Sequence, residues 1–240
     1  MQGHGSTDAI VNIQKDLADI EHHMLHFLEN HDEQRIASPA FAGDARKGMP
    51  AMVVSATLGS SPTMLYFGQE VGEAGAEEPG FGAPTRTSIY DYIGVPHHQR
   101  WMNQGKFDGD TLSGLEKVLR NFYSTLLNYT KSSAALTGEY MEIHSHNRNH
   151  TDWYNDRVFS FVRWKGSDKL IVVTNFDAKE KFGFELSLPS QIIDIWKLVE
   201  GKHPLRDVLG DRSLELTVRE GKARTRIDIE ALESLILELP

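Results

Sequence analysis

The spacing of apolar residues along the chain changes near residue 137. Before that point, apolar residues in the stretch 111–131 recur every three or four positions, which predicts a long amphipathic helix. After it, short runs of valine, isoleucine, leucine and phenylalanine are separated by turn residues, a pattern typical of antiparallel strands. The chain is therefore expected to combine an α/β part with an all-β part. The residues that share one face of the predicted helix are Leu112, Leu115, Leu119, Phe122 and Leu126.

The all-β part is predicted to be an antiparallel β-sandwich over residues 137–240. Its apolar runs include RVFSFVRW, KLIVVTNF and FGFELSL, and Glu220-Gly221 is a predicted hairpin turn. Short strands at this spacing favour two packed antiparallel layers. Because tryptophan buries a large apolar area, the tryptophans of this part are expected in its core or against the N-terminal part. They are Trp153, Trp164 and Trp196.

Two short apolar runs in the N-terminal part are each followed by polar residues. The first, MLHFL at 24–28, precedes Asn30-His31-Asp32, and the second, TMLYF at 63–67, precedes the sequence GQE. Pro50 and Gly59 mark a helix between them, because proline suits the first turn of a helix and glycine its end. Strand, helix and strand in this order predict parallel βα units.

Composition and charge exclude several classes of function. The formal charge of −9 disfavours nucleic acid and anionic membrane as partners, because their phosphate groups would be repelled. The absence of cysteine excludes disulfides, thiolate metal sites and a cysteine nucleophile. The N-terminus lacks the basic and apolar segments of a signal peptide, and no run approaches the roughly 18 apolar residues of a membrane helix. We therefore expect a soluble chain of undetermined compartment.

The stretch 27–32 reads FLENHD and matches a motif of the form F-x-x-N-H-D. Residues 66–70, YFGQE, resemble an aromatic-Gly-x-Glu motif. With the order of the predicted elements, these motifs resemble the C-terminal part of the α-amylase superfamily, glycoside hydrolase family 13, where they end the seventh and eighth strands of a (β/α)8 TIM barrel. The resemblance implies that residues 1–136 are the last two βα units of such a barrel and that a C-terminal β-sandwich follows.

By this resemblance, Asp32 would be a catalytic carboxylate that stabilises the oxocarbenium-like transition state, and His31 would bind the same sugar. Active-site residues of such barrels lie at the carboxyl ends of strands, which would explain the polar end of an apolar run. Without the resemblance, His31-Asp32 would be interpreted as a turn pair, and the aromatic residues of 71–110 as packing of a loop. Glu29 and Arg35 are further candidates, and Arg35 could instead steady a loop carboxylate or form a solvated salt bridge. The expected substrate-binding residues are His31, Asn30, Arg35, Tyr90, Tyr92 and Trp101.

The chemistry needs two further carboxylates that the chain does not supply. Retaining hydrolysis uses a nucleophile and a general acid about 5–5.5 Å apart, and the G-x-R-x-D motif of the family's nucleophile is absent from the sequence. A full barrel takes about 250 residues, whereas only residues 1–136 precede the predicted sandwich. We expect a C-terminal fragment of a retaining glycoside hydrolase that acts on α-glucosidic bonds of starch-like glucans and is inactive alone. The alternative is a non-catalytic sugar-binding or assembly module.

The expected partner is an α-glucan oligosaccharide or polysaccharide. Incomplete barrel strands would leave unpaired edges, so self-association is also expected. No metal ligand is assigned, because the histidines of residues 22–26 and 144–150 lack a matching acidic pattern. No cofactor is expected in this chain, and the resemblance leaves open calcium binding and a secreted or periplasmic location for the intact parent.

Overall fold

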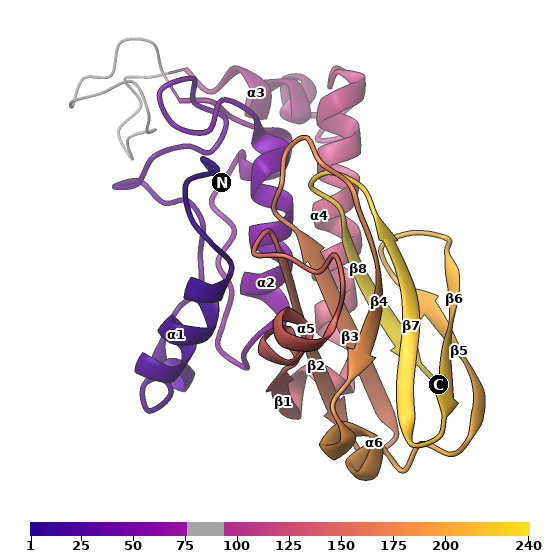
Figure 1. Cartoon of the computed structure of the whole chain (residues 1–240). Helices are drawn as coiled ribbons and strands as arrows, with labels where there is room; N and C mark the ends of the chain where they lie inside the picture. The colour runs from indigo at the N-terminus through magenta and orange to yellow at the C-terminus, as the bar shows by residue number, and fades with distance from the viewer. Residues whose placement is uncertain (76–93) are drawn as a thin grey trace.

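The fold consists of a helical N-terminal part and an eight-stranded β domain (Figure 1). The computed structural model describes residues 1–75 and 94–240, so Tyr90 and Tyr92 lie outside the described residues. The elements before the β domain are α1 (Asp8–Asp16), η1 (Glu21–His23), η2 (Ala45–Gly48), α2 (Met49–Thr57), η3 (Gln69–Val71), α3 (Pro96–Met102), η4 (Asn103–Gly105), α4 (Gly114–Ser132) and η5 (Ala134–Thr137). Those of the β domain are β1 (Glu139–Glu142), α5 (His144–His150), β2 (Val158–Lys165), β3 (Asp168–Asn175), β4 (Phe182–Leu188), α6 (Ser190–Trp196), β5 (Gly201–Asp207), β6 (Ser213–Arg219), β7 (Lys222–Ile229) and β8 (Ser234–Leu239).

The strands form one antiparallel sheet that folds into two layers. Their order is β1-β2-β3-β8-β5-β6-β7-β4. β5 and β8 share only the pairs Arg206↔Glu238 and Asp207↔Leu237, and the two halves of the sheet face each other on either side of that junction (Figure 1). Apolar residues of both halves, such as Ile171 and Leu216, belong to one core between them. The predicted antiparallel all-β domain is therefore confirmed.

β2 and β3 are buried on both faces. Val162 and Ile171 belong to the core of the sandwich, whereas Phe161 and Val172 point the other way and pack in a second core with α2 and α4. These two helices cover the layer formed by β1, β2, β3 and β8 (Figure 1). Burial on both sides explains why these strands are continuous apolar runs in the sequence and do not alternate.

The long helix α4 largely follows the predicted pattern. It begins with a capping box in which Ser113 Oγ accepts from Glu116 N (3.3 Å) and Glu116 Oε2 accepts from Ser113 N (2.7 Å). Leu119 and Leu126 are buried as predicted. Leu115 is 72% exposed, however, because no described element covers its side of the first turn.

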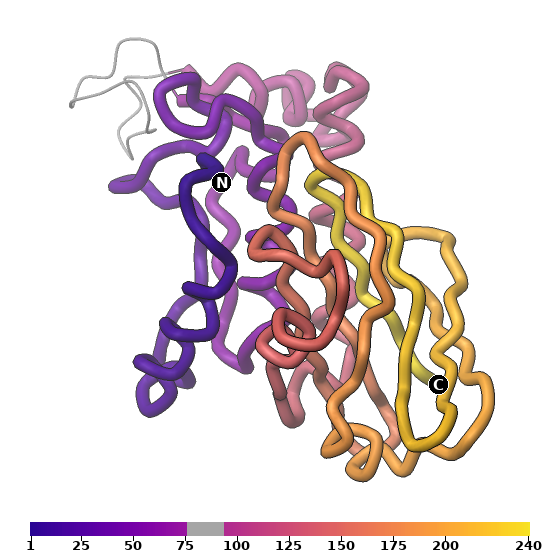
Figure 2. The backbone as a smooth tube through the Cα atoms, in the orientation of Figure 1, coloured from indigo at the N-terminus to yellow at the C-terminus, as the bar shows by residue number. Residues whose placement is uncertain are grey.

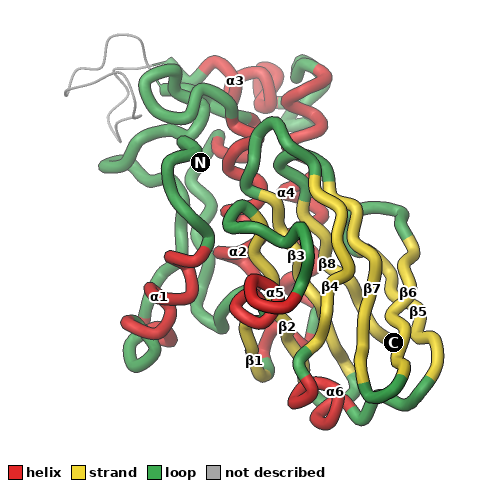
Figure 3. Tube along the Cα trace, viewed as in Figure 1, coloured by secondary structure: helices red, strands yellow, loops and turns green. Residues whose placement is uncertain are grey.

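The two predicted strands of the N-terminal part are not regular strands. Figure 3 shows mainly loop between α1 and α2, and residues 24–28 and 63–67 meet at a single parallel bridge, His26↔Thr63. Two hydrogen bonds hold it, from His26 N to Pro62 O (2.9 Å) and from Met64 N to His26 O (2.8 Å). The parallel direction agrees with the prediction, but the strand assignment is wrong. In the described part of the chain, residues 24–28 and 63–67 pair only with each other, and two strands without further neighbours are not enough for a stable sheet.

Arg163 on β2 joins the β domain to the ends of two helices. Its side chain is 1% exposed. Nη1 donates to the carbonyl oxygens of Thr57 (3.4 Å) and Leu58, and Nη2 donates to those of Leu136 (2.6 Å) and Gly138 (3.1 Å). These carbonyls lie at the C-terminal ends of α2 and η5, where helix carbonyls lack partners within the helix.

Replacing Arg163 by methionine is expected to lower the free energy of unfolding by about 2–3 kcal/mol, because buried carbonyls would lose their donors. Urea unfolding followed by circular dichroism measures this loss. Arg206→Met is the control, since Arg206 is 72% exposed and its pairing with Glu238 lies at the surface. Equal unfolding midpoints for Arg163→Met and the wild type would show that the guanidinium is not needed at the helix ends.

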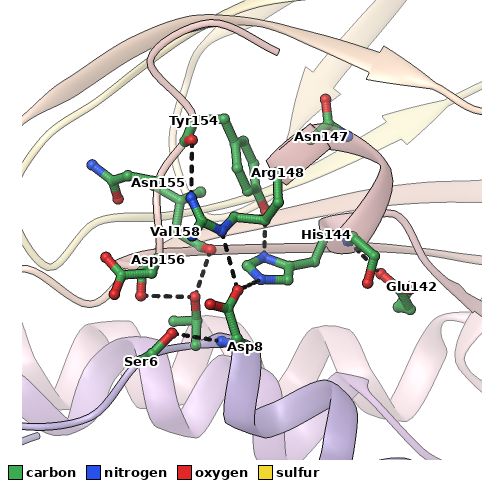
Figure 4. A network of polar contacts seen from close by, with 12 residues as sticks. Ser6, Asp8, Glu142, His144, Asn147, Arg148, Tyr154, Asn155, Asp156 and Val158 are labelled. Carbon is green, nitrogen blue, oxygen red and sulfur yellow. Dashed lines mark hydrogen bonds and ion pairs between the residues drawn. The ribbon is translucent and has the colours of Figure 1, made fainter. Parts of the chain in front are cut away.

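A buried histidine ties the start of α1 to the β domain. His144 is 1% exposed, and its Nε2 lies 2.7 Å from Asp8 Oδ1 while its Nδ1 lies 3.0 Å from Tyr154 Oη. Tyr154 Oη lies 2.9 Å from Ser160 Oγ, and Arg148 Nε donates to Asp8 Oδ1 (3.1 Å). Figure 4 shows the contacts among Asp8, His144, Arg148 and Tyr154, and Figure 2 shows the first residues running beside the loop after α5. The N-terminal part is thus fastened to β2 and α5.

This network predicts a dependence of stability on pH. The hydrogen bond with His144 lowers the pKa of Asp8 from 3.8 to about 2. A carboxyl with a lower pKa in the folded state stabilises the fold above about pH 4 and loses this effect as the pH falls towards 2. Asp8→Asn should be less stable than the wild type at pH 5, and the difference should shrink between pH 4 and pH 2. Urea midpoints measure it. Asp16→Asn, which changes an exposed residue of the same helix, is the control. If its stability changed with pH in the same way, the pH dependence could not be assigned to Asp8.

The tryptophans of the β domain divide into two groups. Trp164 and Trp196 pack edge to face with ring centroids 6.4 Å apart, and Trp196 is 5% exposed, so their predicted packing role is confirmed. Trp153 contradicts the prediction, because its side chain is 83% exposed. It lies between α5 and β2, in a turn whose backbone turns the ring away from the core.

Candidate functional site

His31 and Asp32 lie side by side on an exposed loop that follows the His26–Thr63 bridge. His31 Nε2 lies 3.2 Å from Asp32 Oδ2, and the two side chains are 47% and 74% exposed. An imidazole and a carboxylate are therefore both accessible to a ligand at the same place. The structure brings this predicted pair together as a polar site at the surface.

Asn30 shapes the loop. Its Oδ1 accepts hydrogen bonds from the backbone amides of Asp32 (2.8 Å) and Glu33 (2.8 Å). An asparagine that bonds the amides two and three residues ahead forms an Asx-type turn. Asn30, expected to bind substrate, thus uses its carboxamide oxygen to position the backbone of Asp32.

Below the loop, a buried ion pair joins its two ends. Arg35 Nη1 donates to Glu29 Oε2 (2.8 Å), and Glu29 Oε1 accepts from Ile36 N (2.7 Å). Glu29 and Arg35 are 2% and 0% exposed. Arg35 was expected to bind substrate or to steady a loop carboxylate. Its guanidinium has no exposed surface for a sugar, and in this structure it pairs with Glu29 and closes the loop that carries His31 and Asp32.

The aromatic end of the second motif supports the same arginine. The guanidinium carbon of Arg35 lies 4.5 Å from the centroid of the Tyr66 ring and 5.1 Å from that of Phe67, within the range of cation–π attraction. Burial raises the pKa of Glu29, and the charge of Arg35 opposes that rise. The two motifs therefore meet at Arg35.

Glu29 is a candidate whose role the motif does not define. It occupies a variable position of F-x-x-N-H-D, so the motif contains no sign of its role. The available signal was the spacing of an acid and a base six positions apart around the polar residues. That signal is weak, because most such pairs are solvated at the surface.

Trp101 belongs to a row of rings. Ring centroids are 5.5 Å apart between Phe67 and His98, 5.5 Å between His98 and Trp101, and 5.6 Å between Trp101 and Phe107. The guanidinium carbon of Arg120 lies 4.9 Å from the Trp101 centroid. Trp101 is half-buried, so it packs the N-terminal part together, and stacking on a sugar stays a prediction for this residue.

Residues 1–75 and 94–240 contain no group of three or more histidine, aspartate or glutamate side chains placed to hold a metal ion. The same residues contain no helix that is long and apolar enough to cross a membrane.

Comparison with known proteins finds a family model that matches most of the β domain. Residues 149–239 match the family model described as alpha amylase, C-terminal all-beta domain. A search of curated proteins returns no match to this chain.

Solved structures resemble nearly the whole chain. The crystal structure of the maltogenic α-amylase AmyB from Thermotoga neapolitana has a TM-score of 0.63 at 18% identity, over 99% of this chain and 47% of that one. An Anoxybacillus α-amylase has a TM-score of 0.61 at 16% identity, over 98% and 42%. A variant of AmyP in complex with maltotriose has a TM-score of 0.61 at 21% identity, over 97% and 44%. This chain spans less than half the length of these proteins, and the likeness shows their fold.

Proposed function

We propose that this chain is the C-terminal part of a glycoside hydrolase acting on α-glucosidic bonds of starch-like glucans, because residues 149–239 match the family model of the α-amylase C-terminal all-β domain. The observation that carries the proposal is the accessible His31-Asp32 pair on a loop closed by Glu29 and Arg35. This chain covers less than half of each of the similar amylase structures, which supports its assignment to a C-terminal part.

In the proposed enzyme, residues 1–136 are the last two βα units of a (β/α)8 barrel, and residues 137–240 are the C-terminal domain. The parallel His26–Thr63 bridge and the intervening helix α2 support this arrangement. The rest of the barrel supplies the nucleophile and the general acid of retaining hydrolysis. Site residues then lie at the carboxyl ends of the strands, where the loop after His26 lies.

Asp32 is the transition-state-stabilising residue of the proposed site. A carboxylate beside the reacting sugar favours the positive charge that develops in an oxocarbenium-like transition state. His31, 3.2 Å away, donates to or accepts from a hydroxyl group of the same sugar. Asn30 and the Glu29–Arg35 pair keep both side chains in place on the loop.

The test is the reading frame that contains Met1. We expect the frame upstream to encode a G-x-R-x-D motif and a later catalytic glutamate. The product of the whole frame should release reducing sugar from soluble starch, whereas residues 1–240 alone should not. A stop codon directly upstream, or a full product without activity on starch, would overturn the proposal.

One observation favours a second candidate, a non-catalytic sugar-binding or assembly module. Leu25, Phe27 and Phe67 are 47%, 38% and 40% exposed around the His26–Thr63 bridge. Exposed apolar residues beside a short ladder favour contact with another chain. Sedimentation velocity at increasing protein concentration measures self-association, which both candidates allow. The reading frame upstream of Met1 distinguishes them, because only the hydrolase requires a frame that encodes the rest of the barrel.

A further inference from the structure

Trp153 is exposed to an extent that packing does not explain. It is 83% exposed, the highest value among the large apolar residues that the structure describes as exposed. Its backbone φ is 69°, in the left-handed region that residues other than glycine rarely adopt. The strained backbone makes folding less favourable, and the exposed ring buries almost no apolar surface that would offset this cost. Such outliers persist where a function requires them.

The turn that carries the ring is held on both sides. Thr151 Oγ1 donates to Asn147 Oδ1 (2.7 Å), and Tyr154 N donates to Thr151 O (3.3 Å). Tyr154 itself is 4% exposed, with its hydroxyl in the network of His144. The backbone on either side of Trp153 is thus held in place before a ligand arrives, which reduces the entropy lost on binding.

Polar side chains flank the ring in the sequence. Asp152 is exposed, and Asn155 and Asp156 are half-buried. Figure 4 shows the side chains of Asn155 and Asp156 pointing to the same side, away from His144. Carboxylates and amides bond hydroxyl groups, while the indole face offers an apolar surface. A pyranose ring has the complementary chemistry, with C–H groups on one face and hydroxyl groups at the rim.

We propose that Trp153 is the stacking platform of a surface binding site for α-glucans on the β domain, apart from the loop of His31 and Asp32. The inference rests on the proposed function, which supplies the ligand class. A single projecting ring suits a small ligand better than a protein, because stable protein interfaces bury more than about 1,000 Å².

The experiment measures binding of residues 1–240 to maltoheptaose by calorimetry and to soluble starch by retardation in native gels. Trp153→Ala should raise the Kd for maltoheptaose about tenfold or more and abolish the retardation. Trp153→Phe, which keeps an aromatic face, should retain most of the affinity. Phe107→Ala is the matched control, since Phe107 is also an exposed aromatic residue (55%) with a positive φ (55°), and it should bind as the wild type does.

A glycine variant separates binding from structure. Trp153→Gly relieves the left-handed backbone, because glycine adopts positive φ without a steric penalty. We expect its melting temperature to equal or exceed that of the wild type while glucan binding is lost. A lower melting temperature together with unchanged binding would show that the ring is structural and would overturn the proposal.

The Asp32→Asn variant distinguishes this proposal from the proposed function. If glucan binding survives in Asp32→Asn and is lost in Trp153→Ala, the surface site is supported. If the reverse holds, glucan binds at the His31-Asp32 loop, so this proposal fails while the proposed function stands. Absence of binding by the wild-type chain also overturns this proposal and leaves hydrolysis by the longer enzyme to be tested separately.

Discussion

In the longer enzyme that we propose, Asp32→Asn is expected to lower kcat on soluble starch about a thousandfold. Its carboxylate is 74% exposed and lies beside His31, so it is available to a bound sugar. The amide has nearly the same shape but no charge, and loss of a preorganised electrostatic partner of a transition state costs about a hundredfold to a thousandfold in rate. Initial rates of reducing-sugar release measure the effect.

Glu33→Gln is the control for that experiment. Glu33 is the next residue but one beyond His31, it is exposed, and its backbone amide donates to Asn30 Oδ1 (2.8 Å). The same change of charge at this position should leave kcat within about twofold of the wild type, because the exposed Glu33 side chain is not assigned any interaction that strengthens in the transition state. An Asp32→Asn enzyme that keeps a tenth or more of the wild-type rate would remove Asp32 from the proposed mechanism.

The second large effect concerns the Glu29–Arg35 pair. Arg35→Met should lower the free energy of unfolding by about 3–5 kcal/mol, the usual loss when one partner of a buried ion pair is removed and the other charge stays buried. Both side chains are buried, at 2% and 0% exposure. Burial already raises the pKa of Glu29, and Arg35 opposes the rise. In Arg35→Met the destabilisation should therefore shrink as the pH falls and Glu29 takes up a proton.

Urea unfolding at several pH values measures this loss, with two comparisons. Arg46→Met breaks the pair with Asp44, whose side chains are 59% and 30% exposed, and should cost no more than about 1 kcal/mol. The double variant Glu29→Met/Arg35→Met removes both charges and should be more stable than Arg35→Met alone. A double variant as unstable as the sum of the single ones would mean that the two side chains do not act as a pair.

Several elements could be predicted because their signals are local. Pro50 in the first turn of α2, the Ser113 capping box of α4 and the apolar runs of β2 and β3 are all explained by neighbours in the sequence. The Glu220-Gly221 turn has φ values of 53° and 70°, the positive angles that a two-residue hairpin needs. Hydrogen bonds and rotamer preferences within such segments decide these conformations.

The candidate site was predictable only in part. The motif at 27–32 predicts His31 and Asp32 as site residues, and the structure places both at the surface, while their role stays a prediction. The motif did not define the role of Glu29. Nor did the sequence show that Arg35 is buried while His31 and Asp32 are exposed, because the guanidinium of Arg35 packs against the rings of Tyr66 and Phe67, about thirty residues away. Tyr90 and Tyr92 lie outside the described residues, so their stacking on sugars stays a prediction.

By itself, the sequence determined the secondary-structure elements with strong periodicity and the antiparallel all-β domain, and it contains the polar motif on which the candidate site rests. Only the tertiary structure decided that residues 24–28 and 63–67 meet at one bridge, that Arg163 faces two helix ends, and that Trp153 lies at the surface. The physical reason is common to these cases. Periodicity shows which face of a segment is apolar, whereas ladder partners, carbonyls for a buried guanidinium and cover for a ring all come from distant parts of the chain.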